Sequence, residues 1–189
     1  MANWKEKLKV MSRYDLTAKM YDERYAEEQV AKYKAALKEV DTAKTTVLDV
    51  GCGSGLLFNF IAVKAKTVLG VDISGKLLEQ AKQNAKNFQN VSVVRADADN
   101  LPFKNGFFDE IFAFTILQNM PKPAQTLIEF RRVSKAEGKV VVTGLKKAFP
   151  LDSFYDLANS EGFKVVSFVD DEGLKCYVAV LASICTSAT

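Results

Sequence analysis

Histidine is absent from this sequence of 189 residues, and cysteine and proline are scarce. Without imidazole, the chain lacks the commonest general base and the commonest metal ligand among the side chains. Its three cysteines, Cys52, Cys176 and Cys185, form an odd set with no C-x-x-C spacing, which argues against a disulfide framework and against a zinc site. We therefore expect a protein of a reducing, cytoplasmic compartment that binds no metal.

Long apolar runs and blocks of one charge are also missing. The longest largely apolar stretch, Tyr177 to Cys185, is far too short to span a membrane. The first residues, MANWKEKLKV, contain no apolar core of signal-peptide length. The net charge is only +3, from 26 basic and 23 acidic residues, and the basic residues are scattered. This pattern predicts no membrane partner, and it disfavours RNA as a partner without excluding it.

The composition that remains is typical of one globular domain. Hydrophobic residues make up 48% of the chain and charged residues 26%, which is far from the signature of disorder. Between Arg24 and Val40, apolar residues recur at alternating spacings of four and three, and this predicts an amphipathic helix. The helix belongs to an N-terminal extension, and the core of the domain begins at Thr45.

From Thr45 onward, short β-branched runs alternate with helical patterns. Ser74 is placed to cap the second helix of this region. Such alternation is typical of a parallel sheet with right-handed crossovers. The predicted strands are Thr46–Val50, Thr67–Asp72, Val91–Asp97, Phe108–Thr115 and Lys139–Leu145, and the predicted helices are Leu56–Lys66, Gly75–Phe88 and Pro123–Lys135.

The last part of the chain has a different pattern. A helix is predicted at Leu151–Ser160, and two strands, Lys164–Val169 and Lys175–Ala182, flank a turn at residues 170–173. Two strands that are joined so tightly should be antiparallel. The prediction is therefore a mostly parallel sheet of seven strands with an antiparallel last strand.

Three glycines follow the first predicted strand, in the sequence VLDVGCGSG. Gly51, Gly53 and Gly55 allow the backbone to turn sharply and to approach a ligand closely. In open α/β sheets, ligands bind beyond the carboxyl ends of the strands, where this loop lies. Taken alone, the glycines are equally compatible with a tight turn that binds nothing.

The spacing of the glycines and the acid before them narrow the choice of ligand. A dinucleotide motif, G-x-G-x-x-G, would need its third glycine at position 56, which is Leu56. Asp49 lies two residues before Gly51, where its charge would repel a pyrophosphate but suit an ammonium or a sulfonium. No Gly-Lys-Ser or Gly-Lys-Thr follows, so a P-loop is excluded. A cationic ligand therefore fits better than NAD or ATP.

Carboxylates also end the next two predicted strands. Asp72 lies 21 positions after Gly51, where it can accept hydrogen bonds from both hydroxyls of a ribose. Asp97, followed by Ala98, lies at the same edge of the sheet and can accept a hydrogen bond from an adenine amino group. The alternatives are that Asp72 helps to cap the helix after Ser74 and that Asp97 is a turn residue.

Together these strand ends resemble the class I S-adenosylmethionine-dependent methyltransferases, over Thr45 to Leu145. The sequence ADADNLPF is most similar to the small "type 11" group, which includes quinone-biosynthesis methyltransferases. The resemblance implies a Rossmann-like α/β fold, a three-layer sandwich, with S-adenosylmethionine as the cofactor and S-adenosylhomocysteine as its product. The implied binding residues are Asp49, Gly51 and Gly53 for the methionine moiety, Asp72 for the ribose, Asp97 and Ala98 for the adenine amino group, Ile73 for the adenine ring, and Thr115 beside the cofactor.

The N-terminal stretch SRYDLTAKMYDERYAEEQ is similar to the cofactor lid of the same group. In that group an A-x-x-Y-D element folds over the site, and the resemblance implies that Tyr21 and Tyr25 contact the cofactor. The alternative is a surface helix with aromatic anchors, because tyrosine has an apolar body and a polar tip. We expect a single methyltransferase domain, with residues 1–44 as a helical lid and residues 45–189 as the Rossmann-like core.

The segment after the fourth predicted strand departs from the family. Many members that methylate small molecules carry histidines there, whereas residues 115–119 of this chain read TILQN. The chain also lacks the Asn-Pro-Pro-Tyr element of amino-methylating enzymes. We expect Gln118 and Asn119 either to orient the acceptor or to cap the turn. The sequence shows no strong general base, so the acceptor is either already reactive or loses its proton to a nearby carboxylate or to water.

These features predict an enzyme that transfers a methyl group by in-line displacement to a small molecule, chiefly by positioning the reactants. RNA or protein is the alternative acceptor, because the hairpin turn at residues 170–173 carries no insertion that would build a deep pocket. Two other classes stay open. One is a non-catalytic cofactor-binding module or a subunit of an RNA- or protein-modifying methyltransferase complex, and the other is a nucleotide-dependent oxidoreductase.

Overall fold

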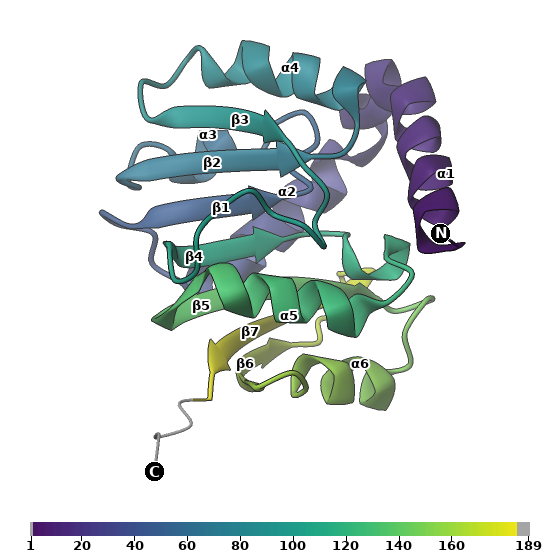
Figure 1. Cartoon of the computed structure of the whole chain (residues 1–189), viewed down its shortest axis with the longest axis vertical. Coiled ribbons are helices and arrows are strands. Elements are labelled where there is room, and N and C mark those ends of the chain that lie inside the picture. Colours follow the sequence, from purple (N-terminus) through teal and green to yellow (C-terminus); the bar gives the residue numbers. More distant parts are fainter. Residues whose placement is uncertain (1, 185–189) are drawn as a thin grey trace.

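A seven-stranded sheet forms the centre of the molecule (Figure 1). The computed structural model describes residues 2–184, without the side chains of residues 2, 3, 19 and 21–24. In sheet order the strands are β3 (Val91–Arg95), β2 (Thr67–Asp72), β1 (Thr46–Val50), β4 (Phe108–Ala113), β5 (Ser134–Leu145), β7 (Cys176–Ser183) and β6 (Phe163–Val169). The pairs from β3 to β5 are parallel, whereas β7 is antiparallel to both of its neighbours. This confirms the predicted mostly parallel sheet with its antiparallel last strand.

Helices cover both faces of the sheet, so the fold has three layers. On one face lie α2 (Tyr21–Glu39), α3 (Phe58–Ile61) and α4 (Gly75–Ala85), and on the other lie α5 (Pro123–Val133) and α6 (Leu151–Ala158). The first helix, α1 (Ala2–Thr17), passes instead along the ends of the strands, as the purple ribbon in Figure 1 shows. Two short 3₁₀ helices, η1 (Ala18–Met20) and η2 (Leu117–Asn119), complete the described elements.

The central strands are apolar on both sides because both sides are covered. In β1, Val47 packs with the helices of one face and Leu48 with those of the other, and in β4 Phe112 and Ile111 divide in the same way. All four side chains are fully buried. Successive side chains of a strand point to opposite faces, so these runs need a helix layer on each side of the sheet.

Several predicted elements differ from the structure in their bounds. The helix predicted at Leu56–Lys66 is helical only at Phe58–Ile61. Beyond it, the carbonyls of Ala62 and Ala65 accept hydrogen bonds from the side-chain amide of Asn90, which favours a turn over a regular helix. Strand β5 begins at Ser134, ahead of the predicted start at Lys139, because α5 ends directly before it and Ser134 pairs with Phe108 at the start of β4.

Strands β3 and β4 stop earlier than predicted, at Arg95 and Ala113. The residues that leave the sheet, 96–98 and 114–116, line a cavity at its edge. The helix cap at Ser74 is confirmed, since its hydroxyl accepts a hydrogen bond from the Leu77 amide at 3.1 Å.

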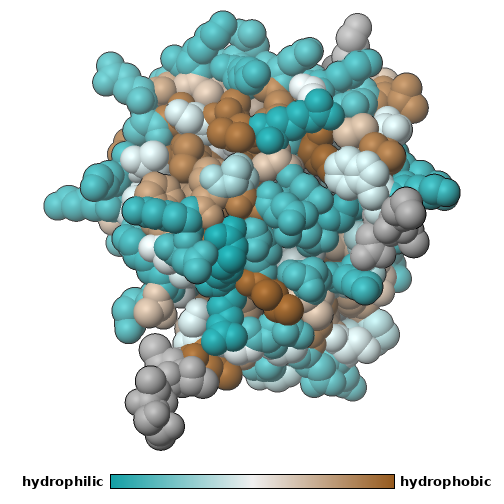
Figure 2. Space-filling view, viewed as in Figure 1, coloured by the Kyte–Doolittle hydropathy of each residue, from teal (hydrophilic) through white to brown (hydrophobic). Residues whose placement is uncertain are grey.

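Polar and charged side chains cover most of the face in Figure 2, with small apolar areas between them. None of the helices within residues 2–184 is long and apolar enough to cross a membrane. Cys52 and Cys176 are buried free thiols, and Cys185 lies outside the described residues.

Candidate functional site

The main cavity lies where the carboxyl ends of β1, β2, β3 and β4 meet, with α1 as its outer wall. It lies beyond the carboxyl ends of parallel strands, where open α/β sheets bind small molecules and cofactors. The sheet order places β4 next to β1, on the side away from β2, so the strand order reverses at this point. Its lining includes Gly51, Gly53, Asp72, Ile73, Asp97, Ala98, Thr115, Ile116 and Asn119 from the strand ends and Lys7, Val10 and Tyr14 from α1.

The glycine loop has the conformation that its sequence predicts. Gly51, Gly53 and Gly55 have φ values of 68°, 57° and 84°, in the left-handed region that side chains disfavour. The Gly51 amide donates a hydrogen bond of 2.7 Å to the Val71 carbonyl, and the Gly53 amide donates one of 3.0 Å to Asp72 Oδ2. The end of β2 therefore fixes the loop.

Two buried carboxylates stand behind this loop. Asp49 is only 3% exposed, and its Oδ2 has no hydrogen-bond partner within the described residues. Burial, together with the charge of Asp72, raises the pKa of Asp49 to about 8. Burial also raises the pKa of Asp72, although the Ser74 and Gly53 amides that donate to it oppose the shift. Such a pair favours a cationic ligand, which would supply the missing positive charge.

At the end of β3, Asp97 meets a cation that the sequence analysis did not identify. Lys7 of α1 is 6% exposed, and its ammonium donates to both oxygens of Asp97, at 2.7 and 2.8 Å, and to Asp99. The predicted adenine-binding carboxylate is thus in the cavity and is paired with the N-terminal helix.

Further contacts fasten α1 across the site. Asp15 accepts hydrogen bonds from the Ser74 hydroxyl and from the Lys76 amide, at the start of α4. Asn119 donates to the Thr115 carbonyl at 2.8 Å and to the Tyr14 hydroxyl at 3.2 Å. Its side chain therefore links the end of β4 to α1.

Of the two tyrosines predicted to contact the cofactor, only Tyr25 has a described side chain. Tyr21 begins α2, and its side chain is outside the described part of the chain. Tyr25 lines a neighbouring cavity, whereas Tyr14 lines the main cavity. A Tyr-Asp pair occurs at both 14–15 and 21–22, so the same sequence pattern could have pointed to Tyr14.

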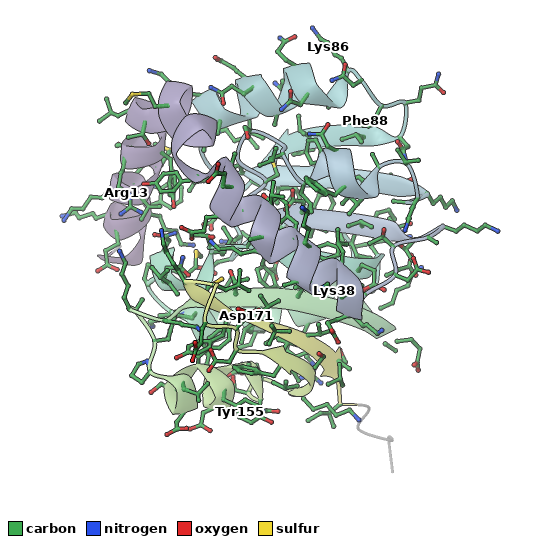
Figure 3. The ribbon with its side chains drawn as sticks, turned by 180° about the vertical axis from the view of Figure 1, so that it is seen from behind. Arg13, Lys38, Lys86, Phe88, Tyr155 and Asp171 are labelled. Carbon is green, nitrogen blue, oxygen red and sulfur yellow. The ribbon has the colours of Figure 1, made fainter. Side chains whose placement is uncertain are left out.

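The neighbouring cavity, here named the basic cavity, is lined by Arg13, Lys32, Lys146, Lys147 and Lys175 together with Glu28, Tyr25, Gln118 and Thr115. Figure 3 shows Arg13 on α1, at the ends of the strands, and α2 running diagonally in front of the sheet. Thr115, Tyr14 and Asn119 line both cavities. Thr115 also has a φ of 63°, which is strained for a β-branched residue. The strained residue thus stands between the two cavities.

Comparison with known families identifies this arrangement. A family described as "Methyltransferase domain" matches residues 48–142, from within β1 to within β5. The chain belongs to this methyltransferase family. The matched region contains the glycine loop, Asp72, Asp97 and Thr115.

Individual relatives agree with the family. An uncharacterised protein of Methanocaldococcus jannaschii is 36% identical over 141 residues, which are 74% of this chain and 53% of that protein. A demethylmenaquinone methyltransferase of Staphylococcus saprophyticus is 34% identical over 112 residues, 57% of this chain and 48% of that enzyme. The chain spans about half the length of these two relatives. A methyltransferase of Aquifex aeolicus shares the Rossmann-like fold, with a TM-score of 0.70, 20% identity, and coverage of 79% of this chain and 88% of that one.

The cofactor that membership of this family implies is S-adenosylmethionine, and the residues around the glycine loop fit it. Asp72 offers carboxylate oxygens to the ligand, and Asp49, whose raised pKa keeps it protonated in the free protein, would ionise beside an ammonium or a sulfonium. The backbone of Gly51 packs closely against Ile116, and a side chain at position 51 would collide with it. The carboxylates and the left-handed glycine loop at these strand ends therefore suit this cofactor.

Proposed function

We propose that this protein transfers the methyl group of S-adenosylmethionine to a small-molecule acceptor. The observation that carries the proposal is the buried Oδ2 of Asp49, which has no hydrogen-bond partner within the described residues and lies behind the glycine loop whose other side, with Asp72, lines the main cavity. Leaving such an atom without a partner costs free energy on the order of 1–3 kcal/mol, and a bound cation removes this cost. An ionised carboxylate at this position would repel the pyrophosphate of NAD.

The proposed contacts follow the strand ends in order. Asp49, Gly51 and Gly53 would hold the methionine moiety, and Asp72 would accept hydrogen bonds from the ribose hydroxyls. Its two oxygens each accept one backbone hydrogen bond already, which leaves lone pairs facing the cavity. Beyond it, Ile73 would pack on the adenine ring, with Asp97 and Ala98 at the amino group and Thr115 at the end nearest the methyl group.

The N-terminal segment, residues 1–44, acts in this proposal as the lid. Its helix α1 contributes Lys7, Val10 and Tyr14 to the wall of the cavity. Opening would require Lys7 to leave Asp97 and Asp15 to leave Ser74, and both are polar contacts that water can replace. Closure would exclude water from the reacting groups.

The chain's own contribution to the chemistry is positioning. S-adenosylmethionine supplies a methyl group on a positively charged sulfur, and an electron pair from the acceptor forms the new bond to carbon as the carbon–sulfur pair returns to sulfur. The cavity walls align the acceptor with that methyl group, and such alignment is worth roughly 7–11 kcal/mol. The sequence has no histidine, so the proposal requires an acceptor that is already a good nucleophile.

Titration calorimetry on the purified chain tests the proposal. The wild-type protein should bind S-adenosylmethionine and S-adenosylhomocysteine, and Asp72→Ala should weaken both by about 100-fold or more, because two hydrogen bonds to a charged group are lost. Asp152→Ala, on exposed α6, is the matched control and should bind like the wild type. Absence of binding by the wild type, or equal binding by Asp72→Ala, would refute the proposal. NAD should raise the melting temperature of none of these proteins.

A further inference from the structure

The basic cavity concentrates the positive charge of the molecule. Its walls carry five cationic side chains, Arg13, Lys32, Lys146, Lys147 and Lys175, and one carboxylate, that of Glu28. The whole chain has a net charge of only +3. The remaining surface is therefore close to neutral, and the cavity is a local site of positive potential.

The carboxylates near this cavity do not neutralise it. Glu28 lies between two cations, with Oε1 at 2.7 Å from Lys32 Nζ and Oε2 at 3.2 Å from Lys175 Nζ. Burial would raise the pKa of Glu28, but these two ammonium groups outweigh burial and hold the pKa below its ordinary value. One carboxylate thus forms ion pairs with two cations, which leaves a net positive charge. A second, Asp170, lies outside the lining and pairs with Lys146 at 2.6 Å.

Lys32 is the most deeply placed of these cations. Its side chain is 2% exposed, and Nζ also donates a hydrogen bond of 3.2 Å to Thr115 Oγ1. This contact brings the positive charge to the residue that separates the two cavities. Gln118, on the same wall, has a buried Oε1 without a hydrogen-bond partner within the described residues, and this atom can accept from a hydroxyl or an amine of a ligand.

The two cavities therefore have opposite electrostatic character. Asp72, together with Asp49 behind the glycine loop, suits the main cavity to a cation, whereas the basic cavity on the other side of Thr115 is suited to an anion. We propose that the basic cavity is the acceptor site, and that the acceptor is a small molecule bearing an anionic group, a carboxylate or a phosphate, which lies among Arg13, Lys147 and Lys175. This inference rests on the proposed methyltransferase function.

The same positive charge bears on the missing general base. Cations near a phenol or a carboxylic acid lower the pKa of that group, because they favour its ionised form. An acceptor of this kind would enter the cavity already deprotonated, or would lose its proton to water there. The site then needs no histidine.

Two matched probes test the charge preference. The protein is first saturated with S-adenosylhomocysteine, and 4-hydroxybenzoate and its neutral isostere 4-hydroxybenzamide are then titrated in while amide chemical shifts are followed by NMR. We expect 4-hydroxybenzoate to bind about tenfold more tightly than the amide, with shifts at Thr115 and Gln118, and its affinity to fall as salt is added. Inorganic phosphate serves as a second anionic probe.

A charge-reversal variant tests whether the anion binds in the basic cavity. Lys147 is exposed on the rim of the cavity, and Lys147→Glu should weaken 4-hydroxybenzoate by about tenfold. Lys164→Glu, equally exposed but at the start of β6 and outside the cavity, is the control and should have no effect.

The outcomes separate this inference from the proposed function. Failure of S-adenosylhomocysteine to bind would count against the proposed function, and the probe titrations on the free protein would still report on the cavity. Equal binding of the two probes, no binding of 4-hydroxybenzoate or phosphate, or equal losses in Lys147→Glu and Lys164→Glu would overturn the anionic acceptor. Tighter anion binding that Lys147→Glu alone abolishes would support it.

Discussion

The side chain of Ile116 lies directly over the backbone of Gly51. A Cβ atom added to Gly51 would come within 2.1 Å of Ile116 Cδ1, and the φ of 68° at Gly51 is itself costly for any side chain. The glycine loop is therefore held between the end of β2 beneath it and the segment after β4 above it.

Two variants separate the backbone strain at Gly51 from the clash with Ile116. Gly51→Ala should reduce stability and weaken S-adenosylhomocysteine binding, because it combines backbone strain of about 1 kcal/mol with a steric clash. Adding Ile116→Ala removes the clash but keeps the strain, so the double variant should recover part of the loss. Thermal denaturation and calorimetry measure both effects. If Gly51→Ala binds like the wild type, the close packing of the loop has no role in binding.

Asp49→Asn should make the folded protein more stable but weaken its binding of S-adenosylmethionine. Because the pKa of Asp49 is raised to about 8 in the folded protein, folding favours the protonated carboxyl, and stability falls as pH rises from the ordinary pKa of 3.8 toward 8. The amide cannot ionise, so the variant should unfold at a higher temperature than the wild type at pH values near 8. It should also lose most of its affinity for S-adenosylmethionine. Denaturation curves across this pH range measure the first effect, and an unchanged pH profile would contradict the burial of Asp49.

Binding of the cofactor should release a proton near neutral pH. Asp49 is mostly protonated in the free protein below its pKa of about 8, and the ammonium of the ligand would favour its ionised form. The affinity should therefore rise by up to about tenfold per pH unit until the pH reaches that pKa. Calorimetry in buffers with different ionisation enthalpies counts the proton directly. If the binding enthalpy of the wild type does not differ between buffers, no proton is released and the prediction is wrong. If Asp49→Asn releases the same proton, the proton does not come from Asp49.

Removal of the Lys7 ammonium should loosen the lid. Lys7→Ala leaves Asp97 and Asp99 without their shared cation, and loss of one partner from a buried ion pair costs on the order of 3 kcal/mol. Amide hydrogen exchange in α1 should accelerate more than exchange in β1. Lys9→Ala, an exposed position on the same helix, is the control and should leave exchange unchanged. Equal exchange in the two variants would show that the ion pair does not hold α1.

The strand ends of the site were predictable from the sequence, whereas the lid contacts were not. The runs Thr46–Val50 and Thr67–Asp72 match the observed strands because their apolar, β-branched patterns are local. Parallel strands bring their carboxyl ends to one edge, so Asp72 and Asp97 were expected together. Lys7 lies 90 positions from Asp97 in the sequence, and only the docking of α1 brings them together. The basic cavity escaped prediction for the same reason, since its cations come from α1, α2, the segment after β5 and the segment before β7.

A crystal structure with S-adenosylhomocysteine is the most direct test of the central claim. We predict that the ribose hydroxyls lie within hydrogen-bonding distance of Asp72, the amino-acid end lies at Gly51 and Gly53 near Asp49, and the adenine lies between Ile73 and Ala98. Density for the ligand in the basic cavity, or with its ribose away from Asp72, would contradict the account.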